Sequence, residues 1–298
     1  MSQLHSFIGR DTLITDGAWG TQLQAQGLAF GVIPDTWNLT HPERVEKVAR
    51  SYVEAGSQVI LTNTFRANRL AMEGVSETDL DTINRTGVAL SRRASKDMLV
   101  FASIGPSGKM LVTGDVSEDD MTAAFLAQAR SLAAGGADAL LIETMSDIAE
   151  ATLAVNAARQ TGLPVLVSFA YGFGSGKDRT MTGAKPEAIA RAMEEAGADA
   201  VGANCGVGIE GISAICERLR QSCTLPIWIK PNAGSPIVEG TSARYEMPPE
   251  RFASHYGRLR EAGATFVGGC CGSTPEFVTA LVKARGELAR SAPSEVQA

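Results

Sequence analysis

The fold of this chain is decided by a short pattern that is clearest at residues 135–144, which read GGADALLIET. Glycine supplies the left-handed backbone on which a helix ends, and the run Ala139–Ile142 that follows is apolar without alternation. Such a run is typical of a parallel strand that is covered on both faces. The same pattern recurs three times: Glu54-Ala55-Gly56 before Gln58–Leu61, Ala196-Gly197-Ala198 before Ala200–Gly202, and Ala262-Gly263-Ala264 before Thr265–Val267.

Four further apolar runs are predicted as strands: Thr12–Thr15, Leu99–Ser103, Pro164–Phe169 and Pro226–Lys230. Helical patterns alternate with the strands over Pro42–Ala55, Glu77–Ser95, Ser117–Ala134, Asp147–Thr161, Lys185–Ala196, Glu210–Gln221, Pro248–Ala262 and Pro275–Leu288. Eight strand–helix units in 298 residues predict an α/β protein with the (β/α)8 TIM-barrel fold. A doubly wound open sheet is the competing architecture, and the lack of a Gly-x-Gly-x-x-Gly opening makes the barrel the favoured one.

The expected barrel accounts for nearly the whole chain. No proline-rich, glycine-rich or charged linker interrupts the pattern, so we expect a single domain over residues 1–290. The tail Ser291–Ala298 is small and polar, and it is predicted to be disordered.

The composition is that of a globular protein with a modest acidic excess. Its 27 basic and 33 acidic residues give a net charge of −6, and 44% of the residues are hydrophobic. A nucleic-acid surface needs a clustered basic excess and a membrane span needs about 18 apolar residues in a row, so we expect neither partner. Residues 1–16 lack the pattern of a secretory signal. Five cysteines, an odd number, do not suggest a disulfide framework, which predicts reduced thiols and a cytoplasmic location.

In such a barrel the residues just after the strands lie together at one mouth, where active sites are built. The positions that follow the predicted strands are therefore the candidate site residues: Asp16-Gly17, Asn63-Thr64, Gly105-Pro106, Glu143-Thr144, Tyr171, Asn204-Cys205, Lys230-Pro231-Asn232 and Cys270-Cys271. Three of the five cysteines belong to this set, although they come from two strands that are far apart in the sequence.

Three thiolates that converge on one point repel each other unless a cation neutralises them, and zinc is the usual metal at sulfur-rich sites. Cys205, Cys270 and Cys271 are therefore the predicted metal ligands and catalytic centre. No fourth cysteine or histidine is expected at the mouth, and three protein ligands are typical of a catalytic zinc site with an open position. Two alternatives stay open: a buried core cysteine beside a chance pair, and a purely structural zinc. Cys216 and Cys223 are expected to serve packing.

Two carboxylates, Asp16 and Glu143, are expected at the same mouth. One interpretation is that each caps the helix after its strand, since acids are common at helix starts. The other is that they bind an ammonium group or orient a substrate. The lack of a histidine among the mouth positions argues against a hydrolase with a histidine-containing triad.

The two cysteine motifs, Gly202-Ala203-Asn204-Cys205-Gly206 and Gly268-Gly269-Cys270-Cys271-Gly272, resemble the zinc signature of the homocysteine S-methyltransferase family, whose fold is a (β/α)8 barrel. The resemblance runs from about Thr12 to Leu288. It includes four further blocks, which are Asp16-Gly17-Ala18-Trp19-Gly20-Thr21, Thr62-Asn63-Thr64-Phe65, Gly136-Ala137-Asp138 through Ile142-Glu143-Thr144, and Pro231-Asn232-Ala233-Gly234. Within the family, the chain is most similar to the homocysteine-binding module of cobalamin-dependent methionine synthase.

The resemblance implies a zinc-dependent enzyme of methionine biosynthesis that transfers a methyl group to the thiol of homocysteine. It implies Zn²⁺ on Cys205, Cys270 and Cys271, with the substrate sulfur as the fourth ligand in its nucleophilic thiolate form.

It also implies the contacts that hold the substrate. Glu143 would take the substrate ammonium, and the Asp16-Gly17 turn would hold the amino-acid end. Asn232 would occupy the fourth zinc position before the substrate arrives.

The methyl donor is left open between two classes. The chain ends after the expected barrel, so we expect no folate or cobalamin module in it. The donor is then either a small molecule, such as betaine or a sulfonium, or a separate methylcorrinoid protein. A further alternative is a homocysteine-binding subunit of a split methionine synthase, with no turnover by itself.

Overall fold

The computed structural model of the chain describes residues 3–9, 11–94, 96–239 and 242–291. Eight parallel strands form one sheet in the order β1-β10-β7-β6-β5-β4-β3-β2. They are β1 (Leu13–Ile14), β2 (Val59–Ile60), β3 (Leu99–Ile104), β4 (Ala139–Met145), β5 (Val165–Phe169), β6 (Ala200–Gly208), β7 (Ile227–Asn232) and β10 (Ala264–Val267). A parallel bridge between Thr15 and Val59 joins the first strand to the last and closes the circle. The predicted TIM barrel is therefore confirmed.

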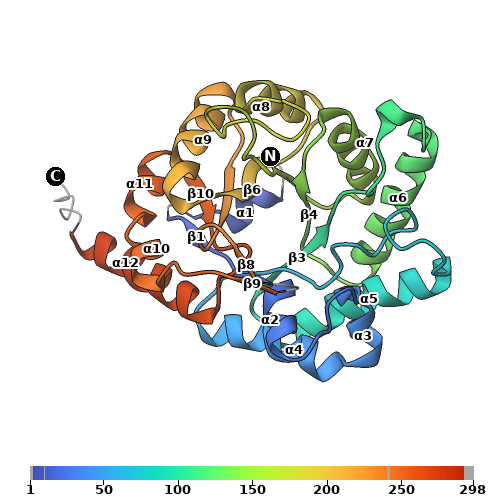
Figure 1. Cartoon of the computed structure of the whole chain (residues 1–298), viewed down its shortest axis with the longest axis horizontal. Coiled ribbons are helices and arrows are strands. Elements are labelled where there is room, and N and C mark those ends of the chain that lie inside the picture. The colour runs from blue at the N-terminus through green and yellow to red at the C-terminus, as the bar shows by residue number, and fades with distance from the viewer. Residues whose placement is uncertain (1–2, 10, 95, 240–241, 292–298) are drawn as a thin grey trace.

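Helices surround the strands as an outer ring (Figure 1). The ring contains α4 (Pro42–Glu54), α5 (Glu77–Ala94), α6 (Glu118–Ala134), α7 (Ile148–Ala158), α8 (Pro186–Glu195), α9 (Ile209–Ser222), α10 (Pro249–Ala253), α11 (Tyr256–Glu261) and α12 (Pro275–Ser291). Short helices α2 (Gly20–Ala25) and α3 (Trp37–Thr40) follow β1, and α1 (Leu4–Phe7) lies inside the ring. Three 3-10 turns are added at Pro34–Thr36, Leu111–Thr113 and Arg159–Thr161.

Two features of the connections differ from the sequence-based expectation. The predicted helix Pro248–Ala262 is wrong as a single helix, because the chain turns between α10 and α11. There the Ser254 hydroxyl donates a hydrogen bond to the carbonyl of Arg251, which satisfies that carbonyl locally, and His255 lies in the turn. An antiparallel hairpin, β8 (Ile237–Glu239) with β9 (Ser242–Arg244), was not anticipated.

The remaining expectations concern the chain ends and membranes. Of the predicted disordered tail, only Ser291 lies among the described residues, as the end of α12, and the rest lies outside them. Within the described part of the chain, no helix is both long and apolar enough to span a bilayer.

The interior of the barrel is filled by apolar side chains from alternate strand positions. They form one cluster with Leu4 of α1, and the members from the strands, together with Leu61 directly after β2, are Leu13, Val59, Leu61, Phe101, Ala139, Leu141, Leu166, Ala200, Trp228 and Phe266. The rings of Phe101, Trp228 and Phe266 pack against one another with centroids 5.3–6.1 Å apart. This layer closes the barrel interior towards the amino ends of the strands, where α1 lies.

The inward positions change from apolar to polar two residues further along the strands. Phe101 is followed by Ser103, Leu141 by Glu143, Leu166 by Ser168 and Trp228 by Lys230. Because side chains alternate with a period of two, these polar residues face the same way as the apolar layer below them. All four are buried, so the carboxyl end of the barrel contains a buried polar layer.

Candidate active site

The structure brings three cysteines together at the carboxyl end of the barrel. Cys205 lies on β6, whereas Cys270 and Cys271 follow β10. Their three Sγ atoms all lie within 4.8 Å of one another, and those of Cys205 and Cys271 are 3.9 Å apart. Among the described residues, no other group of three or more histidine, cysteine or acidic side chains is arranged to hold a metal ion. The two remaining cysteines, Cys216 and Cys223, are buried in packing around α9, as expected.

The separation of the Cys205 and Cys271 sulfurs, 3.9 Å, is close to that of two sulfurs on one tetrahedral zinc ion. Zn–S bonds of about 2.3 Å place neighbouring sulfurs about 3.8 Å apart in a tetrahedron. Hydrogen bonds from the Cys205 and Cys270 thiols lower the pKa of Cys271 to about 3, whereas the hydrogen bond with Cys270 raises the pKa of Cys205. One thiolate thus opposes the ionisation of its neighbours, and a cation is needed before all three can be ionised.

The backbone around Cys205 is shaped by a close approach between strands. Cys205 has φ 54° and Gly206 has φ 56°, so two successive residues adopt the left-handed conformation. A Cβ atom at Gly206 would lie 1.6 Å from the carbonyl oxygen of Tyr171. Only glycine is compatible with this position, which explains why the cysteine motif on β6 ends in glycine.

The three cysteines open into a cavity of about 410 Å³ at the mouth of the barrel. Its walls combine apolar and aromatic surface with a small number of charged groups, as is typical of a small-molecule site. The lining includes Gly17, Trp19, Phe65, Ser103, Glu143, Thr144, Cys205, Lys230, Cys270 and Cys271.

Glu143 projects into this cavity from β4 and is 9% exposed. Burial raises its pKa from 4.5 to about 7, and the neighbouring Lys230 ammonium partly offsets that effect. The Ser103 hydroxyl donates a hydrogen bond to its carboxylate, and the Ser103 amide donates to Thr62 Oγ1 (3.0 Å). Glu143 does not cap α7, because the side chain of Asp147 accepts the amide hydrogen bonds there.

Asp16 is fully buried and forms an ion pair with Lys230 on β7. Its carboxylate also accepts hydrogen bonds from the Trp19 indole and from the amide of Leu61, both at 2.8 Å. Asp16 therefore ties together the seam between β1 and β2 and does not cap α2, whose N-cap residue is Trp19. Gly17, not the Asp16 side chain, belongs to the cavity wall.

Asn232 lies at the end of β7 beside the cysteine pair. The carbonyl of Pro231 accepts a hydrogen bond from the Cys270 amide (2.8 Å), and the amide of Ala233 donates to the Cys271 carbonyl (3.0 Å). Asn232 itself is 7% exposed, and its buried Oδ1 has no hydrogen-bond partner. It is not part of the wall of the 410 Å³ cavity. A buried amide oxygen without a hydrogen-bond partner, on a residue whose neighbours bond the cysteine pair through the backbone, is available as a metal ligand.

A family model described as homocysteine S-methyltransferase matches residues 13–285 of this chain. The chain belongs to the homocysteine S-methyltransferase family. The methionine synthase of Mycobacterium tuberculosis is 29% identical over 310 residues, which cover 97% of this chain and 26% of that protein. The methionine synthase of Mycobacterium leprae is 29% identical over 298 residues, which cover 93% and 24%. The chain thus spans about a quarter of the length of these relatives.

Solved structures of the homocysteine methyltransferase MmuM from Escherichia coli share the fold. The metallated form superposes with a TM-score of 0.76 at 23% identity and covers 91% of this chain and 96% of MmuM. The oxidized form gives a TM-score of 0.77 at 23% identity and covers 95% and 98%.

Several polar residues of this family member were not assigned a role from sequence. Lys230 was placed at the mouth, but its ion pair with Asp16 was not anticipated. The sequence did contain a signal for this ion pair: Lys230 ends the apolar run Ile227–Ile229, and a charge on an inward strand position requires a partner. Ser103 and Thr62, which support Glu143, gave no such signal, since hydroxyl side chains are common in strands and loops.

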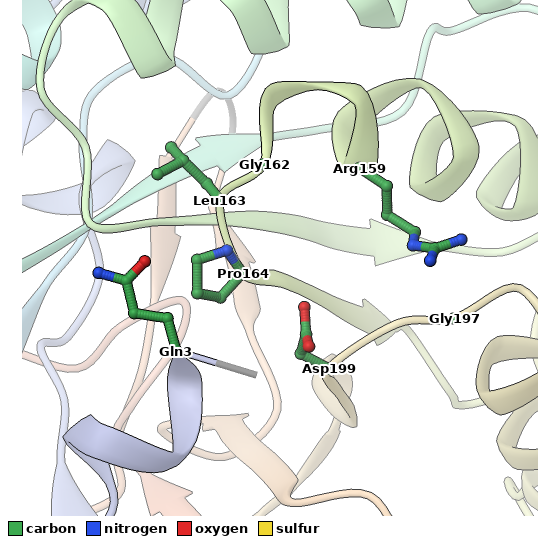
Figure 2. Close-up of a pocket in the computed structure, with 7 residues that line it drawn as sticks. All are labelled: Gln3, Arg159, Gly162, Leu163, Pro164, Gly197 and Asp199. Atoms are coloured by element: carbon green, nitrogen blue, oxygen red, sulfur yellow. The ribbon is translucent and has the colours of Figure 1, made fainter. Parts of the chain in front are cut away.

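A second hollow, of about 230 Å³, opens at the opposite end of the barrel, near the starts of β5 and β6. Figure 2 shows the residues that line it: Gln3, Arg159, Gly162, Leu163, Pro164, Gly197 and Asp199. The Asp199 carboxylate accepts a hydrogen bond from the Val165 amide (2.8 Å) and so supports the first residue of β5. This end of a TIM barrel contributes to stability, whereas catalytic groups lie at the other end.

Proposed function

We propose that this chain methylates the thiol of homocysteine to give methionine at the cysteine-lined cavity of the barrel mouth. One observation carries the proposal: three cysteine sulfurs within 4.8 Å of each other share a cavity with a buried carboxylate, Glu143, and a buried ammonium, Lys230. Homocysteine has one thiol, one ammonium and one carboxylate, so each of its polar groups has a chemically complementary group on this wall.

Zinc is the metal that the site suits best. Cys205, Cys270 and Cys271 would hold it, because three soft sulfurs clustered within 4.8 Å of one another favour zinc over magnesium or calcium. The buried Oδ1 of Asn232, which has no partner in the protein, would complete the ligand set before the substrate is present. When bound, zinc would supply the positive charge that keeps the substrate thiol ionised at neutral pH.

The protein itself would hold the amino-acid end of the substrate. The Glu143 carboxylate binds the substrate ammonium, and its Ser103 hydrogen bond fixes the direction from which it does so. Lys230 provides the positive charge for the substrate carboxylate, with Asp16 holding the lysine from behind the wall and Gly17 of the Asp16-Gly17 turn forming the adjoining wall. Both ends of the substrate are thereby fixed, which positions its sulfur for displacement.

The substrate thiol releases its proton to solvent as it binds, and in the reaction its sulfur forms a bond to the methyl carbon of the donor. The bond between that carbon and the donor breaks in the same in-line step, and the donor leaves with the electron pair. The protein aligns these atoms, and because the sulfur is already ionised, no acid–base group is needed at the methyl carbon. We place the reaction in the cytoplasm, because three neighbouring free thiols need a reducing compartment.

The methyl donor is identified by assay of the purified chain. Betaine, sulfonium donors and a methylcorrinoid protein are each offered with homocysteine, and methionine is measured. Turnover with a small donor defines a self-sufficient methyltransferase. Turnover only with the corrinoid protein defines the homocysteine-binding unit of a split methionine synthase.

The test of the proposal replaces each candidate ligand by alanine: Cys205→Ala, Cys270→Ala and Cys271→Ala. We expect each variant to lose stoichiometric zinc and at least about a hundredfold in methionine formation, because a site with two sulfurs retains the metal poorly. Zinc is measured by atomic emission and activity by methionine formation.

Cys223→Ala is the matched control, since Cys223 is buried but distant from the cluster, and it should retain zinc and activity. Site variants that keep one zinc per chain and full activity would contradict the proposal.

A further inference from the structure

Two residues on the cavity wall have strained backbones. Among the described residues, the non-glycine positions with positive φ are Thr144 (φ 64°), Lys177 (φ 52°) and Cys205 (φ 54°). Thr144 and Cys205 both line the cavity, and Thr144 directly follows Glu143. A β-branched residue in the left-handed region is an outlier that persists only when its surroundings enforce it.

The side chain of Asn204 enforces the conformation of Thr144. Asn204 is fully buried on β6, and its Oδ1 accepts a hydrogen bond from the Thr144 amide (2.9 Å). Its Nδ2 donates to Thr144 Oγ1 (2.7 Å), so both polar ends of one amide bind the same residue. The Ser168 hydroxyl donates a further hydrogen bond to Asn204 Oδ1 (2.6 Å) and holds the amide from β5.

The two segments joined by this amide leave the regular sheet at the same level. The pairing of β4 with β5 is irregular between Ile142 and Met145, which is where Glu143 and Thr144 lie. The pairing of β6 with β7 is irregular between Asn204 and Gly208, which is where Cys205 lies. Because ordinary strand pairing does not fix either segment, the Asn204 side chain supplies a direct connection between them.

We infer that Asn204 is a positioning residue that sets the separation between the Glu143 carboxylate and the Cys205 sulfur. The inference rests on the proposed function, in which Glu143 binds the substrate ammonium and the cysteine cluster receives its thiol. Thr144 is the residue after Glu143, so the Asn204 side chain fixes the backbone next to Glu143. Cys205 is the residue after Asn204, so its position is tied to the same amide. A substrate that is bound at both ends needs this separation to match its length, so Asn204 determines specificity for an amino acid of the length of homocysteine.

The inference is tested by binding of two thiols to the zinc-loaded protein, measured by calorimetry. Homocysteine carries both the thiol and the ammonium, whereas 4-mercaptobutanoate lacks the ammonium. Asn204→Ala should weaken homocysteine binding on the order of tenfold, the loss of one oriented charged contact, and should change 4-mercaptobutanoate binding by less than about twofold.

A second substitution gives a rescue that packing alone does not predict. Glycine adopts the left-handed conformation without support, so Thr144→Gly in the Asn204→Ala background should recover most of the lost homocysteine affinity. Ser168→Ala is the matched control, because it removes a hydrogen bond to Asn204 but leaves both bonds to Thr144. It should weaken homocysteine binding less than Asn204→Ala does.

If Asn204→Ala does not fold, Thr144→Val can be used in its place. It replaces only the Thr144 hydroxyl that Asn204 Nδ2 binds. It too should weaken the binding of homocysteine more than that of 4-mercaptobutanoate. Equal losses for both thiols, or no rescue by Thr144→Gly, would overturn the role of Asn204 while leaving the proposed function in place. Failure of the unsubstituted protein to bind homocysteine would overturn the proposed function, and the inference with it.

Discussion

At the scale of single residues, the site depends on a carboxyl group that is almost entirely buried, with only 9% of the residue exposed to the cavity. Glu143 lies on an inward position of β4, and burial raises its pKa to about 7. A buried carboxylate with few partners attracts an ammonium ion strongly, because the interaction is screened little. The position that suits Glu143 to its proposed role of binding the substrate ammonium therefore also makes it a destabilising group in the free protein.

Because burial disfavours the ionised form of Glu143, the free energy of unfolding is predicted to depend on pH. Between pH 4.5 and about 7 the folded chain retains a proton on Glu143 that the unfolded chain has lost, so the stability falls as the pH rises through this window. We expect Glu143→Gln to increase the free energy of unfolding of the metal-free protein at pH 8, by up to about 3 kcal/mol. The difference from the unsubstituted protein should disappear at pH 4. Chemical denaturation at both pH values measures it.

The same variant tests the role of Glu143 in binding. Glu143→Gln keeps an acceptor for the Ser103 hydroxyl but removes the charge, so the affinity for homocysteine should fall on the order of tenfold. Unchanged affinity, together with unchanged stability at pH 8, would mean that the carboxyl group is neither charged nor used.

At the scale of elements, the barrel is closed by side chains as much as by strand pairing. The first two strands in the sequence, β1 and β2, are assigned two residues each. Asp16 accepts the Leu61 amide hydrogen bond across their seam and forms an ion pair with Lys230 on β7. One buried carboxylate thus links three strands, which ties the integrity of the barrel to the geometry of the site.

Breaking this ion pair should destabilise the fold. Lys230→Met is nearly isosteric and leaves the Asp16 charge without its counter-ion, so we expect a loss of about 3 kcal/mol in the free energy of unfolding. The double variant Asp16→Asn/Lys230→Met should lose less than Lys230→Met alone, because no unpaired charge remains buried. Urea denaturation of the three proteins checks both statements.

An exposed ion pair provides the control for this prediction. Arg85 and Asp81 form a pair one helical turn apart on α5, with both side chains more than 40% exposed. Arg85→Met should change the free energy of unfolding by no more than about 0.5 kcal/mol. Similar losses for Arg85→Met and Lys230→Met would contradict the assignment of a special role to the buried pair.

The elements themselves were largely predictable from local sequence. Four strands were located by a glycine that ends the preceding helix and the apolar run after it, and the other four by their apolar runs alone, each to within a few residues. The break between α10 and α11 was not predictable, because neither Ser254 nor His255, which form the turn, is a glycine or a proline that would mark a helix end. The hairpin of β8 and β9 was also missed, since two three-residue strands have too short a pattern to distinguish them from loop.

At the scale of the whole molecule, the TIM barrel brings the carboxyl ends of strands that are far apart in the sequence together at one site. That topology was sufficient to predict from sequence that Cys205, Cys270 and Cys271 lie together, and the structure brings their sulfurs within 4.8 Å. Topology does not specify which side chains bond to each other. The Asp16–Lys230 pair and the Asn204 hydrogen bonds to Thr144 arise from side-chain packing between strands, for which no local pattern exists.

The central claim is that three protein sulfurs hold a zinc ion whose remaining position is available to the substrate thiol. X-ray absorption at the zinc edge, recorded on the zinc-loaded protein with and without homocysteine, tests it most directly. We predict three sulfur neighbours and one oxygen or nitrogen neighbour without the substrate, and four sulfur neighbours with it. A coordination shell that stays the same when homocysteine is added, or one with fewer than three protein sulfurs, would contradict the account.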